Sequence, residues 1–216
     1  MLRALRNRLR DWRFRRQYPD LYDDDLQAGR LLRLAETMAS KSIAIVGNAE
    51  SIFAADSGAH IDGHDLVVRI NWGFVRDAAC QGARTDLLCL ATSVSTEQIA
   101  AEFGSPEVIF VTPNRWGLSP SLLESRDRIA FFPFDHWRRL SAMIGGRRPS
   151  AGLISVYMSR HVFGSKAVSL FGFDWKATKT FYSSRLRTNH HDWQAERRLM
   201  TLWAQEGWLR LPPPSA

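Results

Sequence analysis

The sequence predicts an α/β protein, a Rossmann-like α/β/α sandwich with a mostly parallel central sheet. Three observations predict this fold class. Short apolar runs recur along the chain, several are separated by stretches with helical spacing, and the runs lack the polar alternation of a half-exposed strand. Strands that alternate with helices in this way are typical of a parallel sheet covered by helices on both faces.

The predicted elements follow one another in a single domain over residues 41–210. The predicted strands are IAIVG 43–47, DLVVRIN 65–71, DLLCLA 86–91, EVIFVTP 107–113, IAFFPF 129–134 and AVSLFGFD 167–174. The predicted helices among them are STEQIAAEF 95–103, PSLLESRD 120–127 and SAGLISVYMSRHVF 150–163. The last residues, LRLPPPSA, have nothing to pack against, and we treat 211–216 as a tail.

Residues 1–40 form a separate lead-in segment. The acidic run at 23–25 predicts the start of a helix that continues to Met38, because negative charge favours a helix N-terminus. Seven of the first 16 residues are arginines, and Leu2, Leu5, Leu9, Trp12 and Phe14 lie between them. Such a basic amphipathic segment can lie on anionic lipid, so we expect residues 1–17 to contact a membrane surface. An acidic partner, nucleic acid and an ordinary solvated helix are the alternatives.

Cysteine usage and hydropathy point to the cytoplasm. Cys80 and Cys89 have no neighbours that suggest a zinc site or a disulfide framework. No apolar stretch reaches the roughly 20 residues that span a bilayer, and the N-terminus lacks the apolar region of a secretory signal. We therefore expect a cytoplasmic protein, and the basic N-terminal segment favours peripheral attachment to the inner face of the cytoplasmic membrane.

The first candidate site residues follow the first two strands. Gly47 allows close approach of a ligand to the backbone, and the Asn48 amide can bond a phosphate or a hydroxyl, although a plain turn is the alternative. The stretch is neither GxGxxG nor a P-loop. Asn71 ends the next strand at the same edge of the sheet. Arg69, in that strand, needs either a ligand or an ion pair with Asp62 or Asp65.

Two later segments complete the predicted nucleotide site. Ser150 is a candidate N-cap, and Ala151 and Gly152 leave the first-turn N–H groups open toward an anion, although helix capping alone would explain Ser150. The last strand ends in a glycine and two aromatic residues that could flank a base or a sugar ring, namely Gly172, Phe173 and Trp175.

A histidine pair precedes the last long helix. Asn189 and Asp192 resemble a capping box, which would place His190 and His191 in the first helical turn. A histidine there stays neutral and can accept a proton, which suits a general base. Glu196 is five residues after His191, about 140° around an ideal helix, so direct contact is doubtful. A two-histidine metal site or a solvated pair are the rival interpretations.

Together these segments resemble the sialylmotifs of the eukaryotic-type sialyltransferases, glycosyltransferase family 29, in a short bacterial-type form. IVGN, IDGHDLVVRIN and GARTD resemble the large motif, PSAGL and LFGFD the small motif, and HDWQAE the very short motif. The chain departs from the family in three places. Ile43 and Ser165 stand where the family has its disulfide, Ala151 replaces a threonine, and the third motif is reduced to FYSS at 181–184 or displaced into His190.

The resemblance implies a GT-A-like variant of the α/β fold and an inverting, metal-independent transfer from a CMP-sugar to a saccharide or glycolipid hydroxyl. It implies catalytic roles for His191, as general base, and Glu196. It also implies a CMP site made by Gly47, Asn48, Asn71, Ser150, Ala151, Gly152, Gly172, Phe173, Trp175 and His190, with no cofactor beyond the donor. The donor would be CMP-sialic acid, CMP-Kdo or another CMP-ulosonic acid, and lipopolysaccharide or capsule biosynthesis would be the setting.

Two other classes of function are weighed against this enzyme. Ala151 and the reduced third motif leave open a nucleotide-binding protein of the same fold that has lost transfer. A nucleic-acid-binding domain ranks last, because the core lacks repeated basic faces beside exposed aromatic residues.

Overall fold

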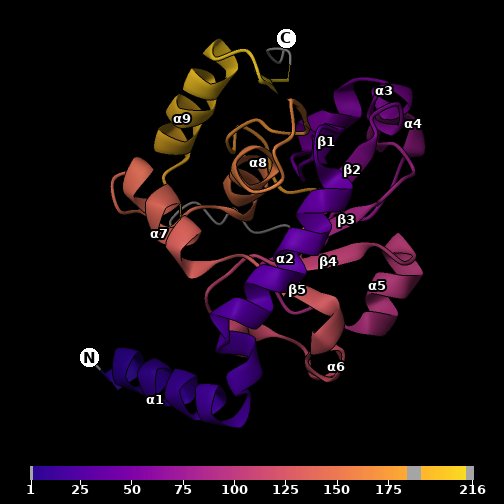
Figure 1. Ribbon diagram of the computed structural model, residues 1–216. Helices are drawn as coiled ribbons and strands as arrows, with labels where there is room; N and C mark the ends of the chain where they lie inside the picture. The colour runs from indigo at the N-terminus through magenta and orange to yellow at the C-terminus, as the bar shows by residue number, and fades with distance from the viewer. Residues whose placement is uncertain (1, 184–190, 213–216) are drawn as a thin grey trace.

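A seven-stranded, all-parallel sheet forms the centre of the protein (Figure 1). The computed structural model describes residues 2–183 and 191–212. The strand order is β5-β4-β3-β2-β1-β6-β7. The strands are β1 Ser42–Val46, β2 Leu66–Ile70, β3 Leu87–Leu90, β4 Glu107–Phe110, β5 Ile129–Phe131, β6 Ala167–Phe171 and β7 Leu209–Arg210. The predicted fold class is confirmed.

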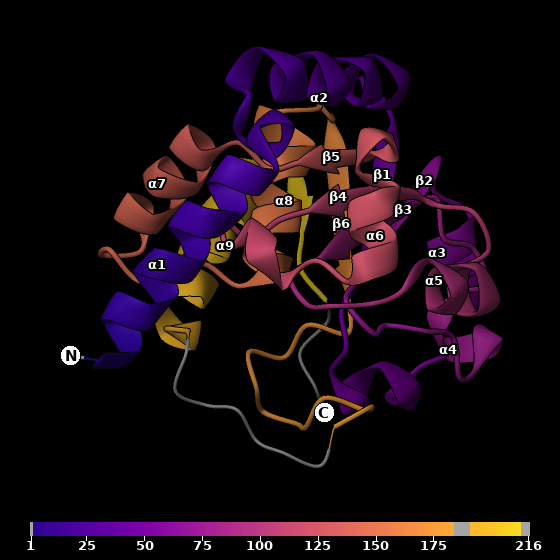
Figure 2. The same cartoon turned by 90° about the horizontal axis from the view of Figure 1, so that it is seen from below.

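Helices cover both faces of the sheet. The α-helices are α1 Leu2–Gln17, α2 Asp24–Met38, α3 Gly58–Asp62, α4 Ala78–Gln81, α5 Thr96–Phe103, α6 Pro120–Glu124, α7 Phe134–Met143, α8 Ala151–His161 and α9 Trp193–Gln205. Short 3-10 helices cover 19–22, 50–54, 115–117 and 126–128. Both views place α7, α8 and α9 on one side of the sheet and α3 to α6 on the other (Figures 1 and 2).

The two faces of the sheet bury alternate residues of the strands. Ile43 and Ile45 of β1 pack with α2, α8 and α9, whereas Ala44 and Val46 pack on the face covered by α3. This alternation is the period-two geometry of a strand, and all four side chains are at most 1% exposed. Strands buried on both faces therefore explain why the sequence shows apolar runs without polar interruptions.

The strand order creates one topological switch point. The chain proceeds outward from β1 through β2 to β5, and then returns to place β6 on the other side of β1. The chain continues from β1 to α3 on one face of the sheet and from β6 to α9 on the other, although the two exits are bonded to each other where the Ala49 N–H donates to the Gly172 carbonyl at 3.2 Å. In open α/β sheets, ligands bind at the carboxyl ends of strands at such a switch point. A ligand site is expected at that position.

Two predicted boundaries are wrong. The predicted strand 129–134 ends at Phe131, and Phe134 begins α7 directly after Pro133, a helix without a counterpart among the predicted elements. Leu209 and Arg210 were assigned to a chain end with nothing to pack against, but they form β7 beside β6, and Leu209 is only 3% exposed. The predicted helix from the acidic run is α2, whose N-cap Asp23 accepts a hydrogen bond from the Leu26 N–H at 2.9 Å. The predicted domain boundaries stay a prediction.

Candidate active site

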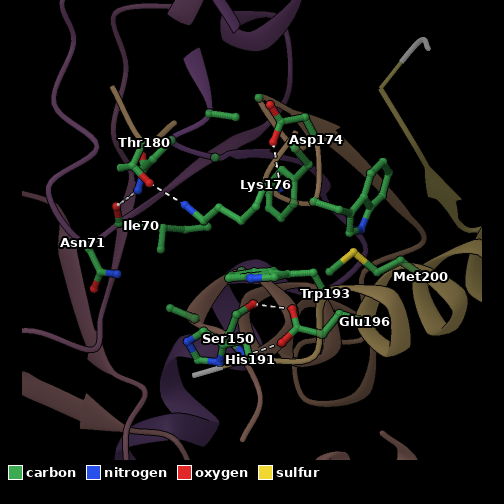
Figure 3. A pocket seen from close by; sticks show the side chains of 18 of the residues that line it. Ile70, Asn71, Ser150, Asp174, Lys176, Thr180, His191, Trp193, Glu196 and Met200 are labelled. Carbon is green, nitrogen blue, oxygen red and sulfur yellow. Dashed lines mark hydrogen bonds between the residues drawn. The ribbon is translucent and has the colours of Figure 1, made fainter. Parts of the chain in front are cut away.

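A cavity opens at the switch point between β1 and β6 and brings the predicted segments together (Figure 3). It lies where the ends of β1, β2 and β6 meet the N-termini of α8 and α9. The predicted residues that line it are Gly47, Asn48, Asn71, Ser150, Ala151, Gly152, Gly172, Phe173, Trp175, His191 and Glu196. His190 lies outside the described residues. Segments up to about 150 positions apart in the sequence therefore share one site.

Asn71 is held with its amide nitrogen available to the cavity. Its backbone is in the left-handed region, with φ +52°, a conformation that asparagine tolerates better than most residues. Its Oδ1 accepts a hydrogen bond from the Ala91 N–H at 2.7 Å. Because only the oxygen of an amide can accept, this contact identifies Nδ2 as the donor directed toward the cavity (Figure 3).

Asn48 makes two contacts within the protein instead. Its Nδ2 donates to the Ile70 carbonyl at 2.8 Å and to the Tyr182 hydroxyl at 3.2 Å. These bonds connect the exits of β1 and β2 to the loop after β6, and they use the donors that we expected to bond a phosphate. The structure thus shows a positioning contact for Asn48, and its predicted contact with a nucleotide stays a prediction.

Glycines let three chain segments close around Phe173. A Cβ atom at Gly47 would lie 2.4 Å from the Gly172 carbonyl oxygen and 2.9 Å from Phe173 Cδ2. A Cβ atom at Gly152 would lie 2.9 Å from Phe173 Cε1. Gly172 itself has φ +65°, which other residues rarely adopt. Gly47 of the large-motif segment and Gly152 and Gly172 of the small-motif segment are therefore required by the close approach of β1, β6 and α8.

Ser150 and Glu196 join the N-terminus of α8 to α9. As predicted, Ser150 is the N-cap of α8, and its Oγ accepts a hydrogen bond from the Leu153 N–H at 3.1 Å. The same Oγ donates to Glu196 Oε2 at 2.6 Å, and the Ser150 N–H donates to Glu196 Oε1 at 2.8 Å. Glu196 is 1% exposed, and burial raises its pKa to about 7 although both hydrogen bonds from Ser150 oppose the shift. Glu196 therefore fixes the start of α8 through Ser150, and the catalytic role predicted for it stays a prediction.

His191 lies before α9 and not in its first turn. The helix begins at Trp193, because the Asp192 side chain accepts a hydrogen bond from the Ala195 N–H at 2.9 Å and so makes Asp192 the N-cap. The predicted capping box that placed His191 inside the helix is therefore wrong, and Asn189 lies outside the described residues. The His191 ring packs edge-on against Trp193, with ring centroids 5.1 Å apart.

One hydrogen bond selects the tautomer of His191. Nδ1 lies 2.9 Å from the Arg148 carbonyl oxygen, which can only accept, so Nδ1 carries a proton. In the neutral ring, Nε2 is then the nitrogen that can take up a proton. The Arg148 carbonyl thus fixes the tautomer and the orientation of the imidazole, and the predicted role of His191 as a base stays a prediction.

Lys176 also lines the cavity and was not predicted. Its ammonium donates to Thr180 Oγ1, lies 5.6 Å from the centre of the Trp193 ring, and has its pKa lowered by burial, with Asp174 opposing the shift. Trp175 and Lys176 have φ +52° and +71°, and Asp174 holds this turn by accepting from the N–H groups of Lys176 and Thr178 at 3.0 and 2.9 Å. Tyr182 and Trp193 were missed as well. No periodic pattern marks these loop residues.

Arg69 is buried and does not line the cavity, and among the described residues it forms no direct ion pair with Asp62 or Asp65, although the charge of Asp62 opposes the lowering of its pKa by burial. Its side chain is 0% exposed and donates to the carbonyls of Gln81, Gly82 and Arg84 and to Thr85 Oγ1, at 2.9 to 3.0 Å. The acids proposed as its partners accept from other groups, Asp62 from the Ala83 and Arg84 N–H groups and Asp65 from Ser42. Hydrogen bonds between the IDGHDLVVRIN and GARTD segments therefore stabilise the structure next to the cavity.

Comparison with known proteins gives one family and a consistent set of structures. Residues 14–113 match the model of glycosyltransferase family 29 (sialyltransferase). Comparison with curated proteins finds no match.

Two solved structures represent the set. A mammalian sialyltransferase aligns with 86% of this chain and 78% of its own, at TM-score 0.61 and 17% identity. The sialyltransferase CstII from Campylobacter jejuni, in complex with the substrate analogue CMP-3FNeuAc, aligns with 79% of this chain and 78% of its own, at TM-score 0.51 and 15% identity. The predicted resemblance is confirmed, and the structural matches establish the fold.

Proposed function

Because the family model and the fold both group this chain with the sialyltransferases, we propose that it is an inverting glycosyltransferase. It moves an acidic sugar, either sialic acid, Kdo or a related ulosonic acid, from a CMP-sugar to a saccharide hydroxyl. The observation that carries the proposal is the cavity at the ends of β1, β2 and β6, where Asn71, the N-terminus of α8 and His191 meet.

The groups around the cavity suit a departing phosphate. The first-turn N–H groups of Ala151 and Gly152 have no preceding helical carbonyl to bind, and the helix dipole favours an anion at this end. The Asn71 amide and the Lys176 ammonium add a neutral and a charged donor. CMP is already a good leaving group, so we infer that orientation and charge stabilisation supply most of the catalysis and that no metal ion is needed.

His191 completes the proposed reaction. Its Nε2 takes the proton of the acceptor hydroxyl as the hydroxyl oxygen attacks the anomeric carbon of the donor. The bond from that carbon to the phosphate oxygen breaks, its electron pair leaves with CMP, and the configuration inverts because attack and departure occur on opposite faces. Trp175 and Phe173 lie within the cavity as candidates to flank the cytidine.

Replacing Asn71 with alanine should weaken CMP binding about tenfold, because one hydrogen bond to a charged group contributes roughly 1.5 kcal/mol. Isothermal titration calorimetry on the full chain measures this change. Lys176→Met should weaken CMP binding as well, whereas Lys179→Met is a matched control that lines no part of this cavity. Equal affinity for CMP and AMP, or unchanged CMP affinity in the Asn71 variant, would count against the site.

We also propose that α1 attaches the protein to an anionic membrane surface. None of the helices within residues 2–183 and 191–212 is long and apolar enough to cross a bilayer. Leu9 and Trp12 are each 52% exposed and lie on one helical face, because they are three residues apart. Arg8, Arg13 and Arg16 are exposed on the same helix. Apolar side chains among arginines fit the boundary between lipid headgroups and acyl chains.

The double substitution Leu9→Ser and Trp12→Ser should reduce sedimentation with phosphatidylglycerol vesicles at least about fivefold, since both side chains lose burial in lipid. A matched control is Leu26→Ser with Leu32→Ser, because these leucines are exposed on α2. Vesicle binding that is the same in both double variants would contradict attachment through α1. Equal binding of the unmodified protein to vesicles of neutral phosphatidylcholine would contradict the proposed attraction between the arginines and anionic lipid.

A further inference from the structure

A second cavity adjoins the first and shares Asn71, Ala151 and His191 with it. The first cavity lies over the ends of β1, β2 and β6. The second includes Thr92, two residues after β3, and Thr112, two residues after β4. Since the sheet order runs β4-β3-β2-β1-β6, the two cavities lie on opposite sides of the β2 exit. Asn71 and His191 therefore lie at the boundary between the two cavities.

The walls of the second cavity carry hydroxyl groups and one large aromatic ring. Thr92 and Thr112 contribute the hydroxyls, and Thr112 is 7% exposed. Trp137 of α7 lines the cavity, and its ring is stacked parallel to Phe134, with centroids 6.2 Å apart and an interplanar angle of 6°. An indole that is supported in this way offers a rigid apolar surface beside polar groups, and ligand pockets typically combine these two features.

We propose that the second cavity binds the acceptor saccharide. A sugar ring offers a face of C–H groups to Trp137 and hydroxyls to Thr92 and Thr112, so the chemistry of the walls fits this class of ligand. The location supplies the second reason. The attacking hydroxyl must reach the base and the donor's anomeric carbon at the same time, and His191 borders both cavities.

The inference rests on the proposed transfer reaction and makes a separate prediction about the acceptor. Trp137→Ala should raise the KM for the acceptor at least about tenfold, which corresponds to about 1.4 kcal/mol, and should leave the affinity for CMP within about twofold. Met143→Ala is the matched control, because Met143 is 48% exposed on the same helix and lines neither cavity. Thr112→Val, a smaller change, should raise the same KM about fivefold through loss of one hydrogen bond.

The experiment uses the full chain, the CMP-sugar that it cleaves fastest, and whichever of lactose, maltose and Kdo-terminated oligosaccharide is the best acceptor. A rise in acceptor KM for Trp137→Ala or Thr112→Val, with CMP affinity kept and acceptor KM unchanged in Met143→Ala, supports the proposal. Unchanged acceptor KM in both variants, or a rise in the KM of the donor alone, overturns it while the transfer reaction stands. Absence of transfer to every saccharide by the unmodified chain counts against the reaction itself and overturns both.

Discussion

Replacing His191 with alanine is expected to lower the turnover number between about 10²- and 10⁴-fold, the usual contribution of a positioned general base. The reason is geometric. The Arg148 carbonyl holds Nδ1–H at 2.9 Å, so in the proposed reaction Nε2 is the nitrogen that takes the proton of the acceptor hydroxyl. The measurement is steady-state release of CMP from a CMP-sugar in the presence of a saccharide.

Affinity for CMP should stay within about threefold in this variant, because the proposed phosphate contacts come from Asn71, α8 and Lys176. His60→Ala is the matched control, since His60 is an exposed histidine on α3, outside both cavities. Near-normal turnover of His191→Ala would remove His191 from the role of base. Loss of both turnover and CMP affinity would show that the ring supports the nucleotide site instead.

Glu196→Ala is expected to lower the free energy of unfolding by roughly 2–5 kcal/mol. Two donors of Ser150, its backbone N–H and its hydroxyl, would lose their acceptor in a buried position, and each unsatisfied donor costs about 1–3 kcal/mol. The same change frees the start of α8, so CMP affinity should fall too. Urea unfolding measures the first effect and calorimetry the second. Glu102→Ala, an exposed position on α5, is the control.

Glu196 should also make stability depend on pH. Its pKa is about 7 in the folded protein against an ordinary value of 4.5, so between these values the folded state holds a proton that the unfolded state has released. The contribution of Glu196 to the free energy of unfolding is therefore fully present below about pH 4.5. It falls by roughly 3 kcal/mol as the pH rises to about 7. Glu196→Gln, which does not titrate, should lack this decline. An identical pH profile of unfolding in both proteins would contradict the assignment.

The central strands and the location of the site could be predicted from the sequence for a physical reason. Apolar runs such as 43–47 and 66–68 are buried on both faces, so composition alone marks them. Parallel strands end at one edge, so Asn71 and Gly172 had to lie near each other once both were placed at strand ends. β7 has only two residues, too few for a periodic pattern. α7 does repeat apolar residues at helical spacing, at Phe134, Trp137 and Leu140, but the predicted strand 129–134 overlaps its start.

The individual contacts in the site could not be predicted, because they depend on segments that are distant in sequence. Lys176 lies in a turn that Asp174 holds through Thr178, and nothing in the local pattern places that turn over Trp193. Arg69 gives the same sequence signal whether it binds a ligand or the loop at 81–85, and only the fold distinguishes the two.

The most direct test of the proposed reaction is a screen of CMP-sugars for release of CMP. The purified chain is incubated with CMP-sialic acid or CMP-Kdo, with and without saccharide acceptors, and with EDTA in parallel samples. We expect at least one donor to be cleaved, faster when an acceptor is present and at an unchanged rate with EDTA. CMP binding without cleavage of any donor would contradict transfer and favour a nucleotide-binding protein of the same fold.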